Sequence, residues 1–221
     1  MKATRSGSVV PIHGSDGVRV ESIERLVDLP GGTASPVLAA EALVTKISEA
    51  PRSAWGFDAP FGGPLGARRT DLERGLENAS AAAADWIREG ILEPLQSNAQ
   101  VCALPLQPAP LIIPGMPAEM IARAASTYLL EVSPVALIAE LQVDDLGVKG
   151  AQAPERRQAL RGLADASLVR PMARALREHA ITDGGMAALL CTVATWRGYR
   201  SYDHGALHAQ AEYAAQGFVY C

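Results

Sequence analysis

Cysteine is scarce in this chain. The 221 residues include only Cys102, Cys191 and Cys221, and no two of them have the Cys-x-x-Cys spacing that metal and redox sites use. An odd count without that spacing indicates a reduced protein. The first residues also lack the apolar core of a signal peptide. We therefore expect a cytoplasmic protein.

Long hydrophobic runs, aromatic residues and an excess of positive charge are absent as well. No run reaches the roughly 18 apolar residues of a membrane span, so we expect no membrane partner. Aromatics make up 5% of the chain and apolar residues 48%, which predicts a core of Ala, Leu, Val and Ile. The net charge of −4 argues against a broad basic surface for nucleic acid. A site that reaches phosphates through a bound metal ion needs no such surface.

Several motifs of well-known enzyme classes are also missing. The chain has no GxxxxGK[ST], GxGxxG or GxSxG motif. Their absence argues against a nucleotide-driven motor, a dinucleotide-dependent enzyme and an α/β-hydrolase. A Cys–His nucleophile pair is not expected either, because Cys191 falls within a nearly all-apolar helical pattern that predicts burial.

The hydrophobic periodicity predicts one α/β domain with a mixed sheet over residues 1–221. Asp16-Gly17 is a hairpin signal, and Ser35-Pro36 and Ser133-Pro134 each predict the start of a helix. Asp183-Gly-Gly predicts a break before the last helix. The predicted strands cover residues 8–12, 17–23 and 127–132, with a further strand that ends at Asp58. The predicted helices cover residues 36–49, 70–95 (ended by Pro94), 134–141, 154–163, 166–179 and 186–197, and residues 101–117 are predicted as a proline-rich loop with at most one short strand.

The stretch from Trp55 to Pro64 is the most informative part of the chain. A short apolar run ends in one carboxylate, Asp58, and then breaks into Pro60, Gly62, Gly63 and Pro64. A strand that delivers an acid to its carboxyl end and then turns is how an α/β sheet presents a group to a ligand crevice. The alternative is a buried strand whose Asp caps the following turn.

Three acids lie at junctions between predicted elements. Asp58 ends one strand, Glu131 lies in the last strand just before a helix, and Asp183 precedes the last helix. Carboxylates gathered at the ends of neighbouring strands would favour Mg²⁺ or Mn²⁺, which prefer carboxylate and water ligands. Such a site can activate water for attack on a phosphodiester. The alternative is that each acid caps a turn or a helix.

Five short motifs, in order, resemble the domain of unknown function 429 family, whose members are predicted RNase H-like nucleases. Each motif is weak alone, and the resemblance as a whole covers about residues 8–220. Ala54–Pro64 resembles the family's G-[IF]-D-x-P-[LF]-G, and Leu130–Pro134 resembles E-V-Y-P. The others are Val148–Gly150 (Y-K-G), Ala187–Trp196 (D-A-L-D-A-L-L-A-A) and Gln216–Tyr220 (E-G-W-I-Y).

The resemblance implies an RNase H-like fold and a nuclease or phosphodiesterase that depends on Mg²⁺ or Mn²⁺. It implies nucleic acid or another phosphodiester as substrate. Asp58 and Glu131 carry over as catalytic acids and metal ligands, and Lys149 carries over as a site cation. The alternative for Lys149 is a structural lysine on a turn.

The departures from the family are as informative as the matches. The family's first strand, a central one that carries an Asp, has no counterpart after Met1, so we expect a divergent or N-terminally truncated member. Ala187 and Gln216 stand where the family has acids. Asp183 lies four residues before Ala187, so it would substitute as a metal ligand from the same helix face. Loss of two acids leaves a second hypothesis open, namely an inactive scaffold or binding module with the same fold.

Two further groups of residues could bind ligands. His204, His208 and Glu212 have the spacing of one helix face, where histidines four apart can share zinc; the alternative is a solvated face. The arginines between residues 156 and 177 could line a phosphate-facing surface. More often, such residues form the solvated face of amphipathic helices.

Overall fold

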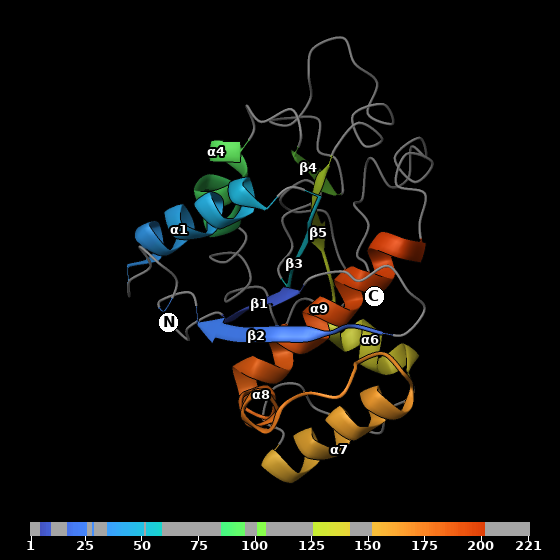
Figure 1. Ribbon diagram of the computed structural model, residues 1–221. Coiled ribbons are helices and arrows are strands. Elements are labelled where there is room, and N and C mark those ends of the chain that lie inside the picture. Colours follow the sequence, from blue (N-terminus) through green and yellow to red (C-terminus); the bar gives the residue numbers. More distant parts are fainter. Residues whose placement is uncertain are drawn as a thin grey trace.

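The chain folds as a mixed α/β protein, mostly helical, with a small parallel sheet (Figure 1). The computed structural model describes residues 5–9, 17–25, 28, 35–50, 52–58, 85–95, 101–104, 126–141 and 152–201. Within these ranges, the side chains of residues 5–9, 101–104, 183 and 201 are outside the description. Residues 70–84 of the predicted second helix also lie outside it.

The parallel sheet contains β3 (Ala54–Phe57), β4 (Val101–Leu104) and β5 (Thr127–Glu131), in the order β3-β5-β4. All five residues of β5 are buried, as expected of a central parallel strand with both faces covered. This confirms the buried strand predicted at 127–132. Strand β4 is the short strand allowed in the proline-rich segment.

A second, antiparallel pair consists of β1 (Arg5–Val9) and β2 (Val20–Arg25). The predicted pairing is confirmed, but both strands are displaced from the predicted ranges. Val18 pairs in parallel with Val169, so the main chain next to the expected turn bonds to a distant segment. The described strands therefore form two sheets, where the sequence predicted one mixed sheet.

One face of the parallel sheet is covered by α1 (Pro36–Glu49), the π-helical turn η2 (Arg88–Leu92) and α4 (Glu93–Leu95). Helix α1 starts at the predicted proline. The helical structure reaches Leu95, which is the predicted end of the helix that Pro94 closes. A proline lacks the N–H for the bond four residues back and clashes with that carbonyl, and the wider π-turn directly precedes it.

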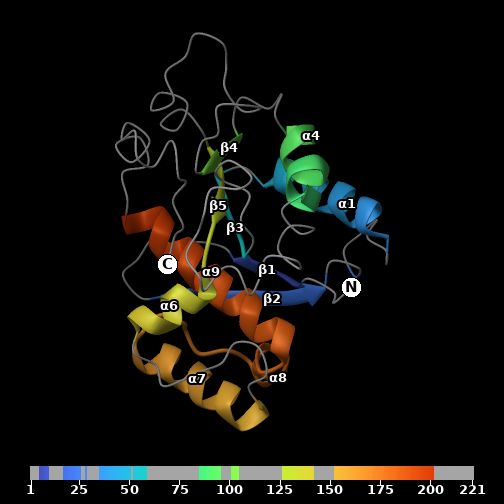
Figure 2. The same cartoon turned by 180° about the vertical axis from the view of Figure 1, so that it is seen from behind.

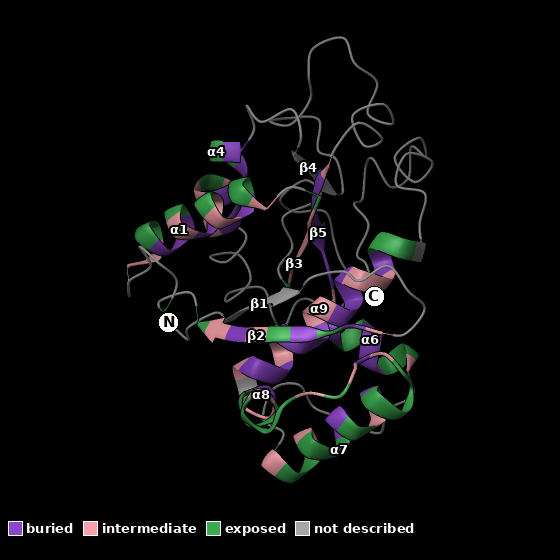
Figure 3. Ribbon diagram, viewed as in Figure 1, coloured by how far each residue is buried: buried purple, intermediate pink, exposed green. Residues whose placement is uncertain are grey.

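On the other side of the parallel sheet, α9 (Asp183–Ser201) contacts β3, and α6 (Pro134–Glu140) packs against α9. Helix α8 (Arg174–Ala180) contacts α9 and β2, and α7 (Ala153–Asp165) adds residues to the same buried cluster. Both views show α1 and α4 on one side of the parallel strands and α7 and α8 at the far end of the molecule (Figures 1 and 2). Helix α9 contacts both β1 and β3. The buried residues form two clusters, one on each side of β5 (Figure 3).

Ser133 opens α6 as predicted, because its hydroxyl accepts a hydrogen bond from the Ala136 N–H at 3.2 Å. The predicted helix over 166–179 is wrong in its first half, since only Arg174–Ala180 is helical. Residues just before it are used elsewhere. Arg170 donates its main-chain N–H to the Val18 carbonyl at 2.8 Å. This hydrogen bond belongs to the bridge between Val18 and Val169, so the Arg170 N–H does not bond within a helix.

Helix α9 begins three residues earlier than predicted. The sequence reads Asp183-Gly-Gly as a break, but Thr182 caps the helix: its hydroxyl accepts from the Gly185 N–H at 3.2 Å and donates to the His179 carbonyl at 2.7 Å. A Cβ on Gly185 would lie 2.0 Å from that same carbonyl oxygen. A residue without a Cβ is needed at position 185 because α8 and α9 approach closely there. Helix α9 continues through Gly185.

Candidate functional site

The two predicted catalytic acids lie at the same edge of the parallel sheet. Strands β3 and β5 are direct neighbours, and Phe57 is the register partner of Glu131. Asp58 follows Phe57, so its backbone is one residue beyond that of Glu131. The Val132 N–H donates to the Phe57 carbonyl at 3.0 Å and holds the two strand ends together. The carboxyl edge, defined here as Asp58 and Glu131 with the strand ends that carry them, is thus formed by adjacent parallel strands.

The alternation of side chains places the two acids on opposite faces of the sheet. Leu129, two residues before Glu131, packs with Trp55 and Phe57 in the cluster beneath α1. Leu130 and Val132 pack in the other cluster, beneath α9. Because side chains alternate along a strand, Glu131 belongs to the α1 face and Asp58 to the α9 face.

Asp58 is exposed and lies against α9 at Cys191. The pKa of the Cys191 thiol is raised well above its usual value, first by burial and then by the negative charge of Asp58. A hydrogen bond from the main chain of Asp58 opposes this effect in part. Cys191 as a whole residue is only half-buried, but the thiol itself is desolvated. It is therefore held protonated and is no nucleophile.

A close contact between β3 and α9 positions the carboxyl edge. A Cβ on Gly56 would lie 1.8 Å from the Thr195 hydroxyl oxygen. That hydroxyl donates to the Cys191 carbonyl at 2.6 Å, which keeps it in the helix groove. Since Gly56 meets Thr195 and Asp58 meets Cys191, the strand and the helix run in opposite directions.

Replacing Gly56 with alanine should lower the free energy of unfolding by about 1 kcal/mol, because the new methyl group must displace a side-chain hydroxyl. Urea denaturation measures the change. Adding Thr195→Ala should restore part of the loss, whereas the matched variant Thr195→Ser keeps the hydroxyl and should not. Equal recovery with both variants would contradict this account of the contact.

Glu131 is almost completely inaccessible, with 2% of its surface exposed. Glutamate is rarely buried to this extent unless it is paired or hydrogen-bonded, because removing its charge from water is unfavourable. The sequence identified Glu131 from its place at a strand end, but burial on the α1 face depends on packing. Glu131 lies beside β3 along the sheet and on the side of the cluster beneath α1.

The remaining predicted site residues are placed less directly. Asp183 is the first residue of α9, eight residues before Cys191, which corresponds to about 12 Å along the axis. The structure therefore brings Asp58 to α9 two turns beyond Asp183. Lys149, His204, His208 and Glu212 lie outside the described residues. Among the described side chains, no three of His, Cys, Asp or Glu gather as a metal-binding group.

Cys191, Gly56 and Thr195 were not predicted as parts of the site. The one signal in the sequence was the glycine at position 56 inside an apolar strand, because glycine within a strand often marks the close approach of another backbone. Which helix would approach could not be read from the sequence.

No protein-family model, curated protein or solved structure matches this chain. The resemblance to the domain of unknown function 429 family therefore stays a prediction that rests on the motifs quoted above. Of the helices in the described ranges, none has the length and apolar character needed to cross a membrane.

Proposed function

We propose that this chain is an RNase H-like phosphodiesterase or nuclease that depends on Mg²⁺ or Mn²⁺ and acts at the carboxyl edge. The observation that carries the proposal is the register of β3 and β5, which puts Asp58 and Glu131 on adjacent strand ends. Ligand crevices of open parallel sheets lie at this edge. The five motifs in family order support the same activity.

The donor chemistry of the carboxyl edge fits a hard divalent cation in part. Asp58 is exposed and offers the carboxylate oxygens that Mg²⁺ and Mn²⁺ prefer. Glu131 is buried on the other face, so it would have to reach a shared ion around the strand end. Lys149 completes the proposed set as site cation. Asp183 starts α9 about 12 Å along the helix axis from Cys191, which is too far for it to share an ion with Asp58. A cation held by these acids would supply activated water and charge neutralisation at a phosphodiester.

A second candidate function is a binding module that keeps the fold without hydrolysis. Asp58 and Glu131 lie on opposite faces of the parallel sheet, which favours this second function. Two carboxylates that share an ion normally converge on it from one side. In this case both acids serve the structure: Asp58 at the α9 contact and Glu131 within the core. The two candidates differ in whether both acids are needed for metal binding.

Calorimetric titration with Mn²⁺ and Mg²⁺ should show binding to the unaltered chain and none to Asp58→Asn or Glu131→Gln. Both substitutions remove a carboxylate charge at nearly constant volume, and each cation is held mainly by that charge. Asp85→Asn, an exposed aspartate on another helix, is the matched control and should bind as the unaltered chain does. Thermal unfolding checks that Glu131→Gln still folds.

Nuclease assays with Mn²⁺ on single- and double-stranded DNA and RNA follow from that result. Cleavage that disappears in Asp58→Asn would support the enzyme. Absence of metal binding in the folded chain would contradict it and support the binding module. Metal binding lost only in Asp58→Asn would also contradict the two-acid site, because it would leave Glu131 a structural role alone.

A further inference from the structure

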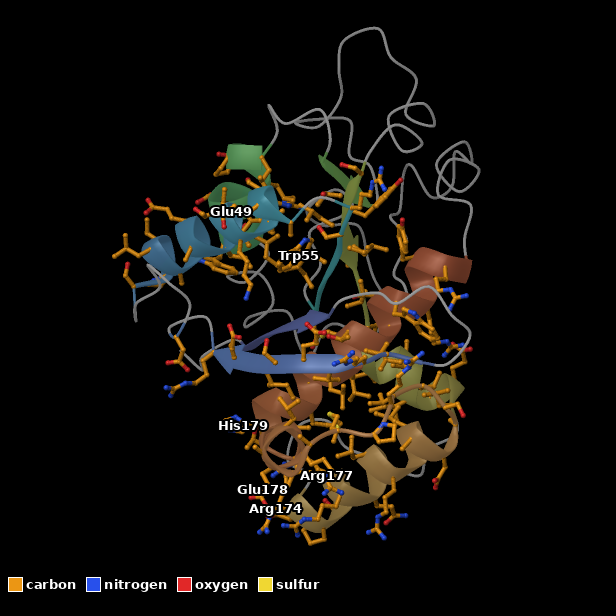
Figure 4. All side chains as sticks on the ribbon, in the orientation of Figure 1. Glu49, Trp55, Arg174, Arg177, Glu178 and His179 are labelled. Atoms are coloured by element: carbon orange, nitrogen blue, oxygen red, sulfur yellow. The ribbon has the colours of Figure 1, made fainter. Side chains whose placement is uncertain are left out.

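A cavity of about 550 Å³ opens between α7 and α8. Five arginines line it, from three segments of the chain: Arg157 and Arg161 on α7, Arg170 on the connection, and Arg174 and Arg177 on α8. One acid, Glu178, accompanies them. Figure 4 shows Arg174, Arg177 and Glu178 grouped on α8, beside α7. The volume is within the range of pockets that hold small organic ligands. We refer to this cavity as the arginine pocket.

The floor of the arginine pocket is apolar. Leu160 and Val169 are buried, with 9% and 3% of their surfaces exposed, and Met172 and Ile181 are half-buried beside them. A site with a charged rim and an apolar floor suits an amphipathic ligand: an anionic group meets the rim while a planar or apolar body covers the floor. A purely solvated helix face would have no such floor.

The walls of the pocket are held by main-chain bonds to other parts of the molecule. The Val18 N–H donates to the Leu168 carbonyl at 2.8 Å, and the Arg170 N–H donates to the Val18 carbonyl at 2.8 Å. On the opposite side, the Arg156 guanidinium donates to the Ile181 carbonyl and ties α7 to the end of α8. The main chain that carries the arginines is therefore held in place, while four of the five side chains are exposed and lose rotamer freedom when a ligand binds.

The arrangement of charges is unfavourable without a ligand. Arg157 and Arg161 are four residues apart on α7, and Arg174 and Arg177 are three apart on α8, so like charges are neighbours on both helices. Arg174 has a partner in Glu178, at 3.3 Å. In the described part of the chain, neither Arg157 nor Arg177 has an ion-pair partner. Among the described residues that line the pocket, five are arginines and one is an acid.

We propose that the arginine pocket binds a nucleotide-sized organic phosphate. Guanidinium groups bind phosphate oxygens in a planar, two-pronged geometry, and the apolar floor takes the base or another flat body. Several arginines around one cavity match the multiple charges of a diphosphate better than those of a carboxylate. The pocket shares no lining residue with the carboxyl edge, so this ligand site is separate from the proposed metal site.

Calorimetry with adenosine diphosphate, inorganic pyrophosphate and adenosine tests the proposal, at physiological ionic strength and with a chelator present. Adenosine diphosphate should bind, pyrophosphate more weakly, and adenosine most weakly. Arg157→Gln and Arg177→Gln should each weaken the binding of adenosine diphosphate by roughly tenfold, as expected for loss of a charge-assisted hydrogen bond. Glu178→Gln should tighten it several-fold, because the competing negative charge is removed.

Two controls separate this site from general electrostatics and from the metal site. Arg52→Gln removes one exposed positive charge between α1 and β3, outside the pocket, and should leave binding unchanged. Asp58→Asn should also bind adenosine diphosphate normally, so that failure of the proposed enzyme activity and failure of this proposal can be told apart.

The proposal is overturned if adenosine diphosphate does not bind, or if Arg52→Gln weakens binding as much as Arg177→Gln. It is also overturned if a single-stranded oligonucleotide binds through Arg157 and Arg177 while adenosine diphosphate does not, since the surface would then serve nucleic acid.

Discussion

Replacing Leu129 with alanine is expected to lower the free energy of unfolding by about 3 kcal/mol, the largest effect of any variant considered for this protein. Leu129 is fully buried in the central strand β5. It packs in the cluster that joins β5 to α1 and η2, with Ile47 and Ile91 among its members. Truncation removes the transfer energy of the side chain and leaves a cavity that helices on one side and strands on the other cannot fill.

Urea denaturation followed by circular dichroism measures this change. Leu38→Ala is the matched control, because Leu38 is a leucine on α1 with 42% of its surface exposed. It should change the free energy of unfolding by less than about 0.5 kcal/mol. Similar losses for both variants would contradict the burial of Leu129 and with it the packing of α1 on the sheet.

Replacing Gly185 with alanine should lower the free energy of unfolding by about 2 kcal/mol. The new Cβ would lie 2.0 Å from the His179 carbonyl oxygen. That oxygen belongs to the main chain at the end of α8, where it already accepts a bond from Thr182, so it cannot move without displacing α8 or α9. The higher helix propensity of alanine offsets only about 1 kcal/mol of this strain.

The same denaturation measurement checks the Gly185 prediction, with intrinsic fluorescence as a second probe. If Gly185→Ala were as stable as the unaltered chain, or more stable, helix propensity would dominate, and the close approach of α8 and α9 would be contradicted. Because Gly185 also belongs to the first turn of α9, the variant tests whether that helix really begins before the glycine pair.

Local signals in the sequence predicted several elements well. The Ser-Pro pairs gave correct starts for α1 and α6, because a proline at the first helical position acts within one turn. Only Ser133 also caps its helix through the side chain. The buried strand β5 was evident from its continuous apolar run. The acidic strand end at Asp58 was evident from the change from apolar residues to proline and glycine.

Predictions went wrong at two places where the contacts made in the structure differ from the expected local structure. Asp183-Gly-Gly has the composition of a break, but Thr182 and the end of α8 convert it to the first turn of α9. Residues 166–173 include Pro171, which itself disfavours a helix through this segment, and the pairing of Val169 with Val18 takes main-chain bonds here as well. In the first case a nearby cap and the end of α8 outweighed the propensity cost of the glycines, about 1 kcal/mol for each. In the second case a contact between residues far apart in the chain and a proline act in the same direction.

The functional sites also divide into features that local sequence could predict and features that depend on packing between elements. Asp58 could be singled out from the sequence because it ends a predicted strand before a turn, and Glu131 because it lies in a predicted strand just before a helix. Their adjacency depends on β5 inserting between β3 and β4, and strand order is not a local property. The register of β3 against β5 places the two acids on opposite faces of the sheet. A shift of one residue would bring both acids to the same face.

The positions of most helices and strands, and the two acids near the strand ends, follow from local patterns, because capping, periodicity and proline act over a few residues. Only the packed structure places Asp58 against α9 beside Cys191 and buries Glu131 on the opposite face of the sheet. Packing also brings five arginines from three segments to one pocket. Those outcomes depend on packing between elements distant in the chain, which no local pattern encodes.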